Sequence, residues 1–219
     1  MDAEIEANLS RLVAIVPVGS LEGAKSRLGE SLDPEERQAL VIDLLERTIR
    51  AAVAAPGVSS VIVVSPDPAV LDIATASGAI ALRQRQTGLN EGLREASASA
   101  AGDGAGAVLV IASDLPAIST AALSTLIAEA ASADGRSAKG LVEIVSDCHG
   151  RRTNVLLVSP PDLIPFAFGP NSRAAHLSAA RLAGATVLET DSPLRLDLDL
   201  PDDLLLAEQL ALIGPGHGG

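Results

Sequence analysis

The sequence is poor in aromatic residues, cysteine and lysine. It contains no Trp or Tyr, and Phe166 and Phe168 are its only phenyl rings. The core must therefore be filled by Ala, Leu, Val and Ile, and stacking of nucleic-acid bases on aromatic side chains is not expected. A single cysteine, Cys148, excludes an intrachain disulfide and a zinc-binding thiolate cluster, which fits a reducing cytoplasm.

The charge balance is strongly acidic. The formal net charge is −12 and no run of Lys and Arg stands out, so a polyanionic nucleic acid is not an expected partner. The N-terminal segment, residues 1–9, is acidic, and no apolar stretch approaches the roughly 20 residues that span a bilayer. We therefore predict a soluble cytoplasmic protein that binds neither nucleic acid nor membrane.

What the sequence does contain is ample apolar material for one core. Hydrophobic residues make up 47% of the 219 residues, which suffices for a single domain. We expect this domain to span residues 11–212, after an N-terminal extension (residues 1–10). Residues 213–219 are glycine-rich and predict a flexible tail.

Short Val- and Ile-rich runs alternate with Ala/Leu/Glu segments of helical period, which is the pattern of βαβ units. The predicted strands are Leu12–Val18, Ser60–Ser65, Ala79–Leu82, Ala107–Ala112, Gly140–Val145, Asn154–Ser159 and Ala185–Glu189. The predicted helices are Pro34 to about Ala55, Pro68–Ser77, Asn90–Ala100, Thr120–Ser132, Ser172–Leu182 and Asp202–Leu212. Several strands are apolar at every position, as expected where helices cover both faces of a sheet. The predicted fold is a three-layer α/β/α sandwich with a mostly parallel mixed sheet.

The first candidate site is the loop of residues 19–27, which follows the first strand and contains Lys25, one of only two lysines. A cation just past a strand is where α/β proteins commonly receive nucleotide phosphates. The loop also matches the P-loop pattern G-x-x-x-x-G-K-[ST], except that Ala24 replaces the second glycine. Ala24 lacks the backbone freedom of glycine, and a glycine and a proline interrupt the helix that should follow. A P-loop NTPase or kinase is therefore a less favoured alternative, and a merely solvated Lys25 is another.

The second candidate is Asp114, which ends the apolar run Val108–Ala112 and precedes Pro116. At the carboxyl end of a parallel strand, Asp114 would face the crevice where α/β sheets bind ligands. This is a metal-binding position. The alternative is that Asp114 caps the next helix, but Ser119 is better placed to do so.

The third candidate is the acidic pair Asp197 and Asp199. If this segment is extended, both side chains point to one face while the intervening leucines point to the other. Two like charges on one face repel unless a cation lies between them. Together with Asp114 they would offer three oxygen ligands suited to Mg²⁺. The alternative is an exposed edge in which Asp202 caps the last helix.

Two further loops are candidates for anion binding. Arg151 and Arg152 precede Thr153 and Asn154, a plausible cradle for a phosphate or carboxylate. Residues 168–173 lead into a helix whose free amides suit an anion. Each loop is equally compatible with ordinary turn and cap chemistry.

Seven short motifs occur along the chain in the same order as in a known protein family. They are Val16-Pro17-Val18, Ala24 to Leu28, Gly88-Leu89-Asn90, Ser113 to Pro116, Gly150 to Asn154, Phe168 to Ser172 with His176, and Leu194 to Asp199. The sequence resembles the phospholactate guanylyltransferase family over nearly its whole length. That family makes the activated precursor of the deazaflavin coenzyme F-420 and has the fold of nucleotide-diphospho-sugar transferases. Each motif alone is weak, but seven in order are hard to obtain by chance.

The resemblance implies a nucleotidyltransferase that moves GMP from GTP onto the phosphate of a small acid and releases pyrophosphate. The acid would be 2-phospho-L-lactate or phosphoenolpyruvate, with 3-phosphoglycerate as a further candidate. By position, Asp114, Asp197 and Asp199 would hold Mg²⁺, and Lys25 and Arg27 would contact the GTP phosphates. Lys25, Arg27 and Asp114 would thus be the catalytic residues.

The resemblance also implies the substrate contacts. The nucleotide would lie against Val16, Pro17, Val18, Gly88, Leu89 and Asn90. The acid would be contacted by Thr153, Asn154, Gly169 and Ser172. The chain departs from the family at Gly19, where a lysine is frequent, and at Arg151-Arg152, where small residues are usual. The choice of acid, the guanine specificity and the oligomeric state, monomer or homodimer, therefore stay open.

The chemistry needs no triad of nucleophile, base and acid. A phosphate monoester has a second pKa of about 6 and is already largely dianionic at neutral pH. Alignment and charge neutralisation should therefore carry catalysis. The residues also leave open a nucleotidyltransferase for a sugar phosphate or a molybdopterin, although the Leu-x-Gly-Gly loop usual in such enzymes is missing. A nucleotide sensor without turnover is the non-enzymatic hypothesis.

Overall fold

The computed structural model describes Leu9 and residues 11–133 and 139–214, so most of the predicted N-terminal extension and C-terminal tail lie outside the described residues. One sheet contains β1 (Leu12–Pro17), β2 (Val58–Ser65), β3 (Ile80–Arg83), β4 (Ala107–Ile111), β5 (Leu141–Ser146), β6 (Thr153–Ser159) and β7 (Thr186–Glu189). The α-helices of the described part are α2 (Pro34–Val53), α3 (Pro68–Ala76), α4 (Leu89–Gly102), α5 (Thr120–Ala133), α6 (Ser172–Ala183) and α7 (Pro201–Gln209). Two short 3-10 helices are η1 (Ser26–Leu28) and η2 (Pro193–Arg195). Every predicted strand and helix is present, with ends shifted by a few residues.

The strands pair in the order β3-β2-β1-β4-β6-β5-β7. β1 is parallel to β2 and β4, β2 to β3, and β5 to β7, whereas β6 runs antiparallel to β4 and β5. The predicted mostly parallel mixed sheet is therefore confirmed. The chain proceeds from β1 outward through β2 and β3 and then crosses to β4 on the other side. The carboxyl ends of β1 and β4 thus form a topological switch point, where α/β sheets bind ligands.

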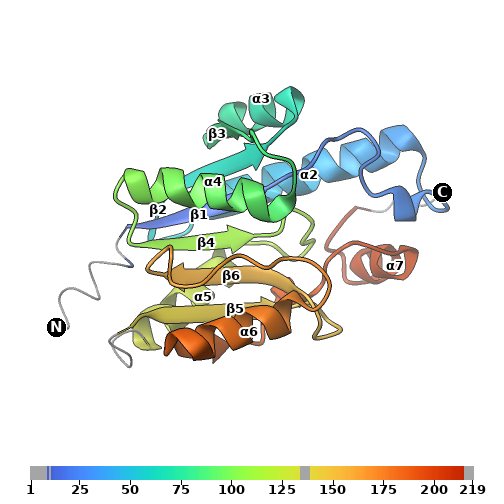
Figure 1. Ribbon diagram of the computed structural model, residues 1–219. Helices are drawn as coiled ribbons and strands as arrows, with labels where there is room; N and C mark the ends of the chain where they lie inside the picture. The colour runs from blue at the N-terminus through green and yellow to red at the C-terminus, as the bar shows by residue number, and fades with distance from the viewer. Residues whose placement is uncertain (1–8, 10, 134–138, 215–219) are drawn as a thin grey trace.

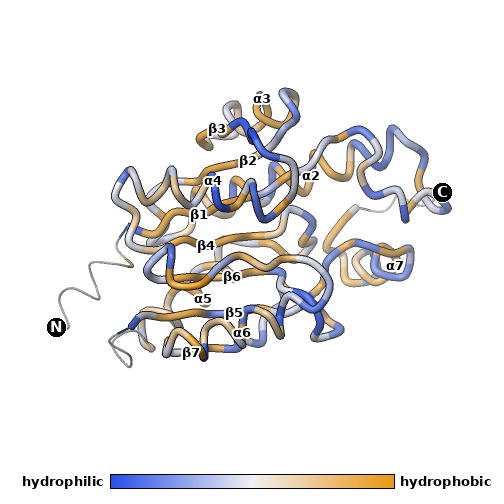
Figure 2. Tube along the Cα trace, viewed as in Figure 1, coloured by the Kyte–Doolittle hydropathy of each residue, from blue (hydrophilic) through white to orange (hydrophobic). Residues whose placement is uncertain are grey.

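Helices cover both faces of the sheet, as the uniformly apolar strands predict. On one face, side chains of α2, α3 and α5, such as Leu45, Val70 and Leu123, pack on the strands. On the other face, α4 and α6 contribute Leu93 and Leu177. Figure 1 shows α4 and α6 in front of the sheet and α5 behind it. Figure 2 shows the central strands as a hydrophobic layer.

A third apolar cluster lies beside the sheet, where α7 packs against the first half of α2. Leu40 and Leu44 of α2 meet Leu204 of α7, and Leu28 of η1 and Leu198 lie among them, all nearly inaccessible to solvent. Ile213, the first residue of the predicted tail, is also buried in this cluster. The cluster fixes both the loop after β1 and the segment before α7, which are the two segments that carry Lys25 and Asp199.

The C-terminal segment differs from the sequence prediction in two respects. Residues 194–200 contain part of η2 and no strand, although Leu198 is buried and Asp197 and Asp199 are partly exposed. Leu200, the residue that precedes the first turn of α7, is 45% exposed. The last helix ends at Gln209 rather than at residue 212, since Ala211 has a positive φ of 54° that ends the helical path.

The loop after β1 does not have the geometry of a P-loop. Only the three-residue η1 follows Lys25, and α2 starts at Pro34 with Asp33 as its N-cap. A P-loop places its lysine at the start of a helix. Among the described residues, no helix is long and apolar enough to cross a bilayer.

Candidate active site

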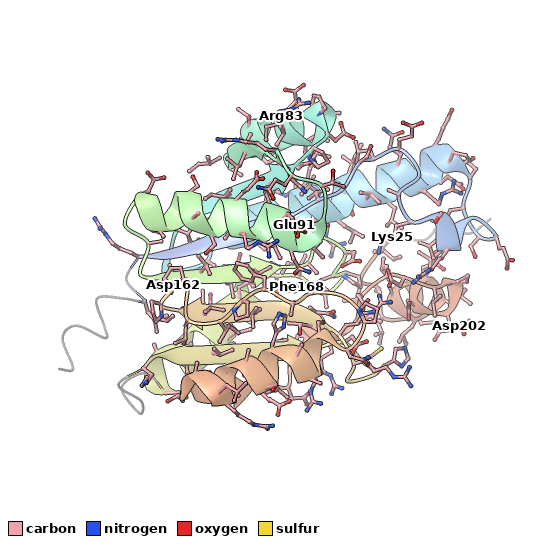
Figure 3. All side chains as sticks on the ribbon, viewed as in Figure 1. Lys25, Arg83, Glu91, Asp162, Phe168 and Asp202 are labelled. Carbon is pink, nitrogen blue, oxygen red and sulfur yellow. The ribbon has the colours of Figure 1, made fainter. Side chains whose placement is uncertain are left out.

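Three segments that are far apart in the sequence bring charged side chains together at the carboxyl ends of β1 and β4. Asp114, Asp197 and Asp199 each present a carboxylate oxygen, and these oxygens lie within 4.8 Å of one another. The ammonium of Lys25 contacts Asp114 Oδ2 at 2.5 Å and Asp199 Oδ1 at 3.1 Å. Figure 3 shows Lys25 on the side of the molecule where α7 lies. The convergence of these residues, which the sequence predicted, is therefore present.

The loop that carries Lys25 is held from α3. The carboxylate of Asp67 accepts hydrogen bonds from Leu21 N–H at 2.9 Å and from Ser20 Oγ at 3.1 Å, and it also caps α3. The hydrogen bond from Leu21 lowers the pKa of Asp67. Lys25 itself has φ 52° and ψ 38°, a left-handed conformation that costs a residue with a side chain about 1–2 kcal/mol. Its contacts with Asp114 and Asp199 offset this cost.

Asp199 has three cationic neighbours. Lys25 contacts one carboxylate oxygen, while Arg152 NH1 at 2.6 Å and Arg27 NH1 at 3.7 Å approach the other. Burial disfavours the ionised carboxylate, but Lys25 and Arg152 outweigh this effect and lower the pKa of Asp199. Burial likewise opposes the charge of Lys25, yet Asp114 and Asp199 raise the pKa of the ammonium. Both groups are therefore charged at neutral pH.

Asp197 lacks such a partner among the described residues. Its nearest polar contact is the side-chain amide of Asn154, at 3.4 Å. Burial, together with the neighbouring charges of Asp114 and Asp199, raises the pKa of Asp197 to about 6. An added cation at this place would relieve the repulsion between the three carboxylates.

The segment that carries both C-terminal aspartates is fixed by hydrogen bonds to the rest of the site. Asn154 donates to two backbone carbonyls of η2, at 3.0 and 3.1 Å. Asp203, in the first turn of α7, accepts from the backbone N–H of Asp199 at 3.1 Å. Leu198 N–H donates to the carbonyl of Asp114 at 3.1 Å. Asn154 therefore supports the carboxylates, and Asp203, rather than the predicted Asp202, satisfies the free amides before α7.

A second cluster of polar residues joins the start of β6 to the start of α6. Because β6 runs antiparallel to β4, its first residues lie beside the end of β4. Thr153 N–H donates to Ser172 Oγ at 2.9 Å, and Thr153 Oγ1 lies 3.0 Å from Nδ1 of His176. His176 Nε2 accepts from Ala167 N–H, so Nδ1 carries the proton and donates to Thr153. Burial lowers the pKa of His176 to about 4, which keeps the ring neutral.

The side chain of Asn90 connects α4 with the loop before α6. It donates to the carbonyl of Phe168 at 3.0 Å and accepts from the N–H of the same residue at 2.8 Å. The ring of Phe168 also meets that of His176 edge-on, with centroids 4.9 Å apart. Gly169 follows with φ +138°, a conformation that residues with a side chain rarely adopt. These contacts fix the loop of residues 167–170 over the end of the sheet.

Three cavities lie in this region, and two of them reach the charged cluster. The largest, of 590 Å³, contains Asp114, Thr153, Gly169 and Ser172, and Arg27 and Arg152 also line it. The second, of 280 Å³, is bounded by residues 17–19 and 84–89 and shares Pro17, Gly19 and Leu89 with the first. The third, of 410 Å³, lies across Arg27 and Arg152 and is lined by Asp197, Asp199 and the loop of residues 147–152. The carboxylate cluster therefore lies where separate cavities meet.

The predicted nucleotide contacts divide between these surfaces. Pro17, Val18, Gly88 and Leu89 line the 280 Å³ cavity. Val16 is fully buried in the core instead, because it lies one residue before the end of a strand covered on both faces. The side chain of Asn90 is engaged with the backbone of Phe168. Residues 84–87 also line this cavity, and the carboxylate of Glu95 holds their backbone by accepting from the N–H groups of residues 85 and 86, at 2.9 Å each.

Sequence reasoning missed several of these residues. Asp67, Glu95 and Asp203 support the site through backbone N–H groups, and only the Asp67-Pro68 pair carried a recognisable helix-start signal. Arg152 was noticed in the sequence but received no partner there. Its contact with Asp199 bridges 47 positions, which no local pattern could indicate.

The donor set fits a hard divalent cation. Three carboxylates from two segments converge, all of them partly buried, and among the described residues Asp197 forms no salt bridge with a cationic side chain. Mg²⁺ prefers carboxylate and phosphate oxygens and keeps part of its water shell, which the adjoining cavities can accommodate. Neither a thiolate nor an imidazole belongs to this cluster, so a zinc site of the usual N/S type does not fit.

Comparison with known proteins agrees with this geometry. The family described as "Guanylyl transferase CofC like" matches residues 12–216. A phosphoenolpyruvate guanylyltransferase of Rubrobacter xylanophilus is 43% identical over 197 residues, covering 89% of this chain and 92% of the relative. One from Sphaerobacter thermophilus is 42% identical over 200 residues, covering 91% and 92%.

The fold is shared with solved nucleotidyltransferases. A nucleotidyl transferase from Methanothermobacter thermautotroptrophicus superposes with a TM-score of 0.62 at 16% identity, covering 92% of this chain and 98% of the other. This likeness concerns the fold alone, whereas the sequence matches extend over the site residues as well. The chain therefore belongs to the CofC-like guanylyl transferase family.

Proposed function

We propose that this protein is a GTP-dependent guanylyltransferase that transfers GMP to the phosphate of a small phospho-acid and releases pyrophosphate. The observation that carries this proposal is the convergence of three carboxylates and Lys25 at the meeting point of two cavities. The names of the relatives make phosphoenolpyruvate the first candidate acid. 2-Phospho-L-lactate and 3-phosphoglycerate are the alternatives, and coenzyme F-420 biosynthesis is the pathway that the family favours.

The cavities of 280 and 590 Å³, which share lining residues, suit two substrates. We place the guanine base in the 280 Å³ cavity beside the ends of β2 and β3, and the acid in the 590 Å³ cavity near Thr153, Gly169 and Ser172. Leu89 and Pro17 line both cavities, so a nucleotide that extends from the first reaches the second. The nucleotide phosphates would then lie near Lys25 and Arg27.

The reaction forms one bond and breaks one. A phosphate oxygen of the acid attacks the α-phosphorus of GTP, and the bond from that phosphorus to the bridging oxygen breaks, so pyrophosphate leaves with the bonding electrons. The attacking phosphate is already largely dianionic, because its second pKa is about 6. The protein therefore needs no general base. Its side chains have to align two anions and neutralise their charge.

Named residues divide this work. Lys25 and Arg27 neutralise the nucleotide phosphates, and Arg152, which lines the cavity that we assign to the acid, binds the acid. Thr153 is held by Ser172 and His176 in a fixed orientation towards the acid. Asp114, Asp197 and Asp199 would hold Mg²⁺, which when bound supplies further charge neutralisation and orients the phosphates.

The decisive assay follows pyrophosphate release in the presence of Mg²⁺. Each of the four nucleoside triphosphates is combined with phosphoenolpyruvate, 2-phospho-L-lactate, 3-phosphoglycerate and a sugar phosphate. We expect release with GTP and one of the phospho-acids. Equal rates with every nucleotide, or release of orthophosphate, would contradict the proposal. A sugar phosphate as the preferred acceptor would favour another nucleotidyltransferase.

The first variant to test is Asp114→Asn. It keeps the shape of the side chain but removes a negative charge that contacts Lys25, so we expect turnover to fall by orders of magnitude with the fold retained. Asp162→Asn is the matched control, since Asp162 lies at the opposite side of the molecule from Lys25 (Figure 3). Near-normal pyrophosphate release by a folded Asp114→Asn protein would refute the role of this carboxylate. The cytoplasmic location and a monomeric or homodimeric state remain predictions.

A further inference from the structure

The ammonium of Lys25 neutralises part of the negative charge of the three carboxylates. Its ammonium contacts an oxygen of Asp114 and an oxygen of Asp199, two of the three candidate metal ligands. The side chain is only 13% exposed. The second oxygen of Asp199 is approached by Arg152 and Arg27. Side-chain cations therefore contact both oxygens of Asp199.

A divalent ion bound to both Asp114 and Asp199 would compete with this arrangement. Mg²⁺ binds oxygen at about 2.0–2.1 Å, so its ligand atoms lie close around one point. The ammonium already lies within 3.1 Å of one oxygen from each of these carboxylates. An ammonium and a dication that share two carboxylates also repel each other strongly in a partly buried site. Binding of the dication to these two carboxylates should therefore weaken or break the contacts of Lys25.

The ammonium of Lys25 can move from the carboxylates towards the neighbouring cavity. Asp114, which Lys25 contacts, lines the 590 Å³ cavity, and so do Gly19 and Arg27 of the loop that carries Lys25. The flexible four-carbon stem of a lysine moves its charge several ångströms without a change of backbone. An ammonium released from Asp114 would face this cavity beside Arg27, near which we place the nucleotide phosphates.

We propose that Lys25 takes the place of the divalent ion in the ion-free protein, and that the arriving ion displaces it towards the nucleotide. This inference rests on the proposed function for the identity of the nucleotide. It makes Lys25 both a competitor of the metal and a ligand of the phosphates. The free protein should therefore bind the ion weakly, and ion and nucleotide should bind more tightly together than apart.

The first test uses the wild-type protein and its two lysines. Reductive methylation followed by mass spectrometry gives the ratio of labelling at Lys25 to that at Lys139, which is exposed before β5, at the other end of the sheet. Without metal, Lys25 should be protected. Saturating Mg²⁺ alone should raise the ratio several-fold, and Mg²⁺ with a non-hydrolysable GTP analogue should lower it again. An unchanged ratio at saturating Mg²⁺ would overturn the proposal.

The second test measures Mn²⁺ binding without nucleotide by electron paramagnetic resonance. Lys25→Met removes the competing charge, so it should bind Mn²⁺ roughly tenfold or more tightly than wild type, while it binds the GTP analogue less tightly. Lys25→Arg keeps the charge and Lys139→Met lies outside the site, so both should resemble wild type. If Lys25→Met binds Mn²⁺ no more tightly than wild type, the proposal is wrong. Neither test needs turnover, so a failure of the guanylyltransferase assay would leave both results readable.

Discussion

At the scale of single residues, two buried ionisable groups outside the carboxylate cluster have opposite effects on stability. Glu143 of β5 is 1% exposed, and one of its oxygens has no hydrogen-bond partner among the described residues. Burial and, to a smaller extent, the neighbouring charge of Glu129 in α5 raise the pKa of Glu143 to about 7, although the hydrogen bond donated by Thr190 opposes this rise. The folded state therefore binds the proton more tightly than the unfolded chain, and stability falls as pH rises from about 4.5 to 7.

His176 acts in the opposite direction over nearly the same range. Its folded pKa of about 4 is below the ordinary 6.5, so the unfolded chain binds the proton more tightly. Stability from this group rises as pH rises from about 4 to 6.5. The two contributions largely cancel, and wild-type stability should depend little on pH between about 5 and 6.5 as far as these two groups decide it.

We predict that Glu143→Gln reveals the contribution of Glu143 to the pH dependence of stability. The variant loses the cost of ionising a buried carboxylate, so at pH 8 it should be more stable than wild type by on the order of 2 kcal/mol, and the difference should vanish towards pH 4.5. Urea unfolding at pH 5 and pH 8 measures this. Glu46→Gln, on the exposed face of α2, serves as control. An equal difference between Glu143→Gln and wild type at both pH values would contradict the assignment.

The sequence allowed us to predict which residues belong to the site, but not which residues they contact. Asp114, Asp197 and Asp199 stood out because each follows or alternates with leucine- and valine-rich sequence. The hydrogen bond between His176 and Thr153 joins residues 23 positions apart. The ion pair between Arg152 and Asp199 joins residues 47 positions apart. Such pairs depend on how the chain folds back on itself, and local periodicity carries no information on that.

At the scale of elements, helix caps connect stability to the site. Asp67 caps α3 and also accepts from Leu21 and Ser20, so it anchors the loop that carries Lys25. Asp33 caps α2 in a similar way, through Glu36, and no hydrogen bond of its side chain to residues 19–27 is present in the described structure. The two aspartates thus form a natural pair of test and control.

We predict that Asp67→Ala and Asp33→Ala each lower the free energy of unfolding by about 1–2 kcal/mol, the usual cost of a lost cap. Only Asp67→Ala should also raise the KM for GTP several-fold, because it frees the loop after β1. Chemical denaturation and steady-state kinetics check the two effects separately. A rise in KM of the same size in both variants would mean that general destabilisation, rather than loop anchoring, is responsible.

The elements themselves were largely predictable, because their apolar periods are clear. The seven strands stand at the predicted positions, and each predicted helix starts within one residue of its predicted start. The antiparallel direction of β6 was not predictable, since its sequence is as uniformly apolar as that of β4, which pairs in parallel with β1. Nor was the irregular course of residues 196–200, which follows from packing of Leu198 against α2 and α7.

At the scale of the whole molecule, the walls of the site come from both halves of the sheet. The loops after β1 and β4 provide Lys25 and Asp114, whereas β6 and the C-terminal segment provide Thr153 and Asp199. A ligand that contacts all of them binds only the complete fold. Binding should therefore stabilise the protein as one cooperative unit.

We predict that Mg²⁺ and GTP together raise the thermal midpoint of unfolding. Each tenfold increase of ligand concentration above its Kd should add about 1.4 kcal/mol. Asp162→Asn should follow wild type, while Asp114→Asn should lose the part that depends on Mg²⁺. Differential scanning calorimetry at several GTP concentrations provides the measurement, and a midpoint that is independent of GTP would contradict a site shared by both halves.

Lys25 and Asp199 are separated by 174 positions, nearly the full length of the polypeptide. During synthesis, the loop after β1 thus leaves the ribosome long before its acidic counterpart exists. A nascent or prematurely terminated chain that stops short of Asp199 can neither pair this lysine fully nor assemble the three-carboxylate cluster. Unfinished copies of the protein should therefore be unable to turn over cellular GTP.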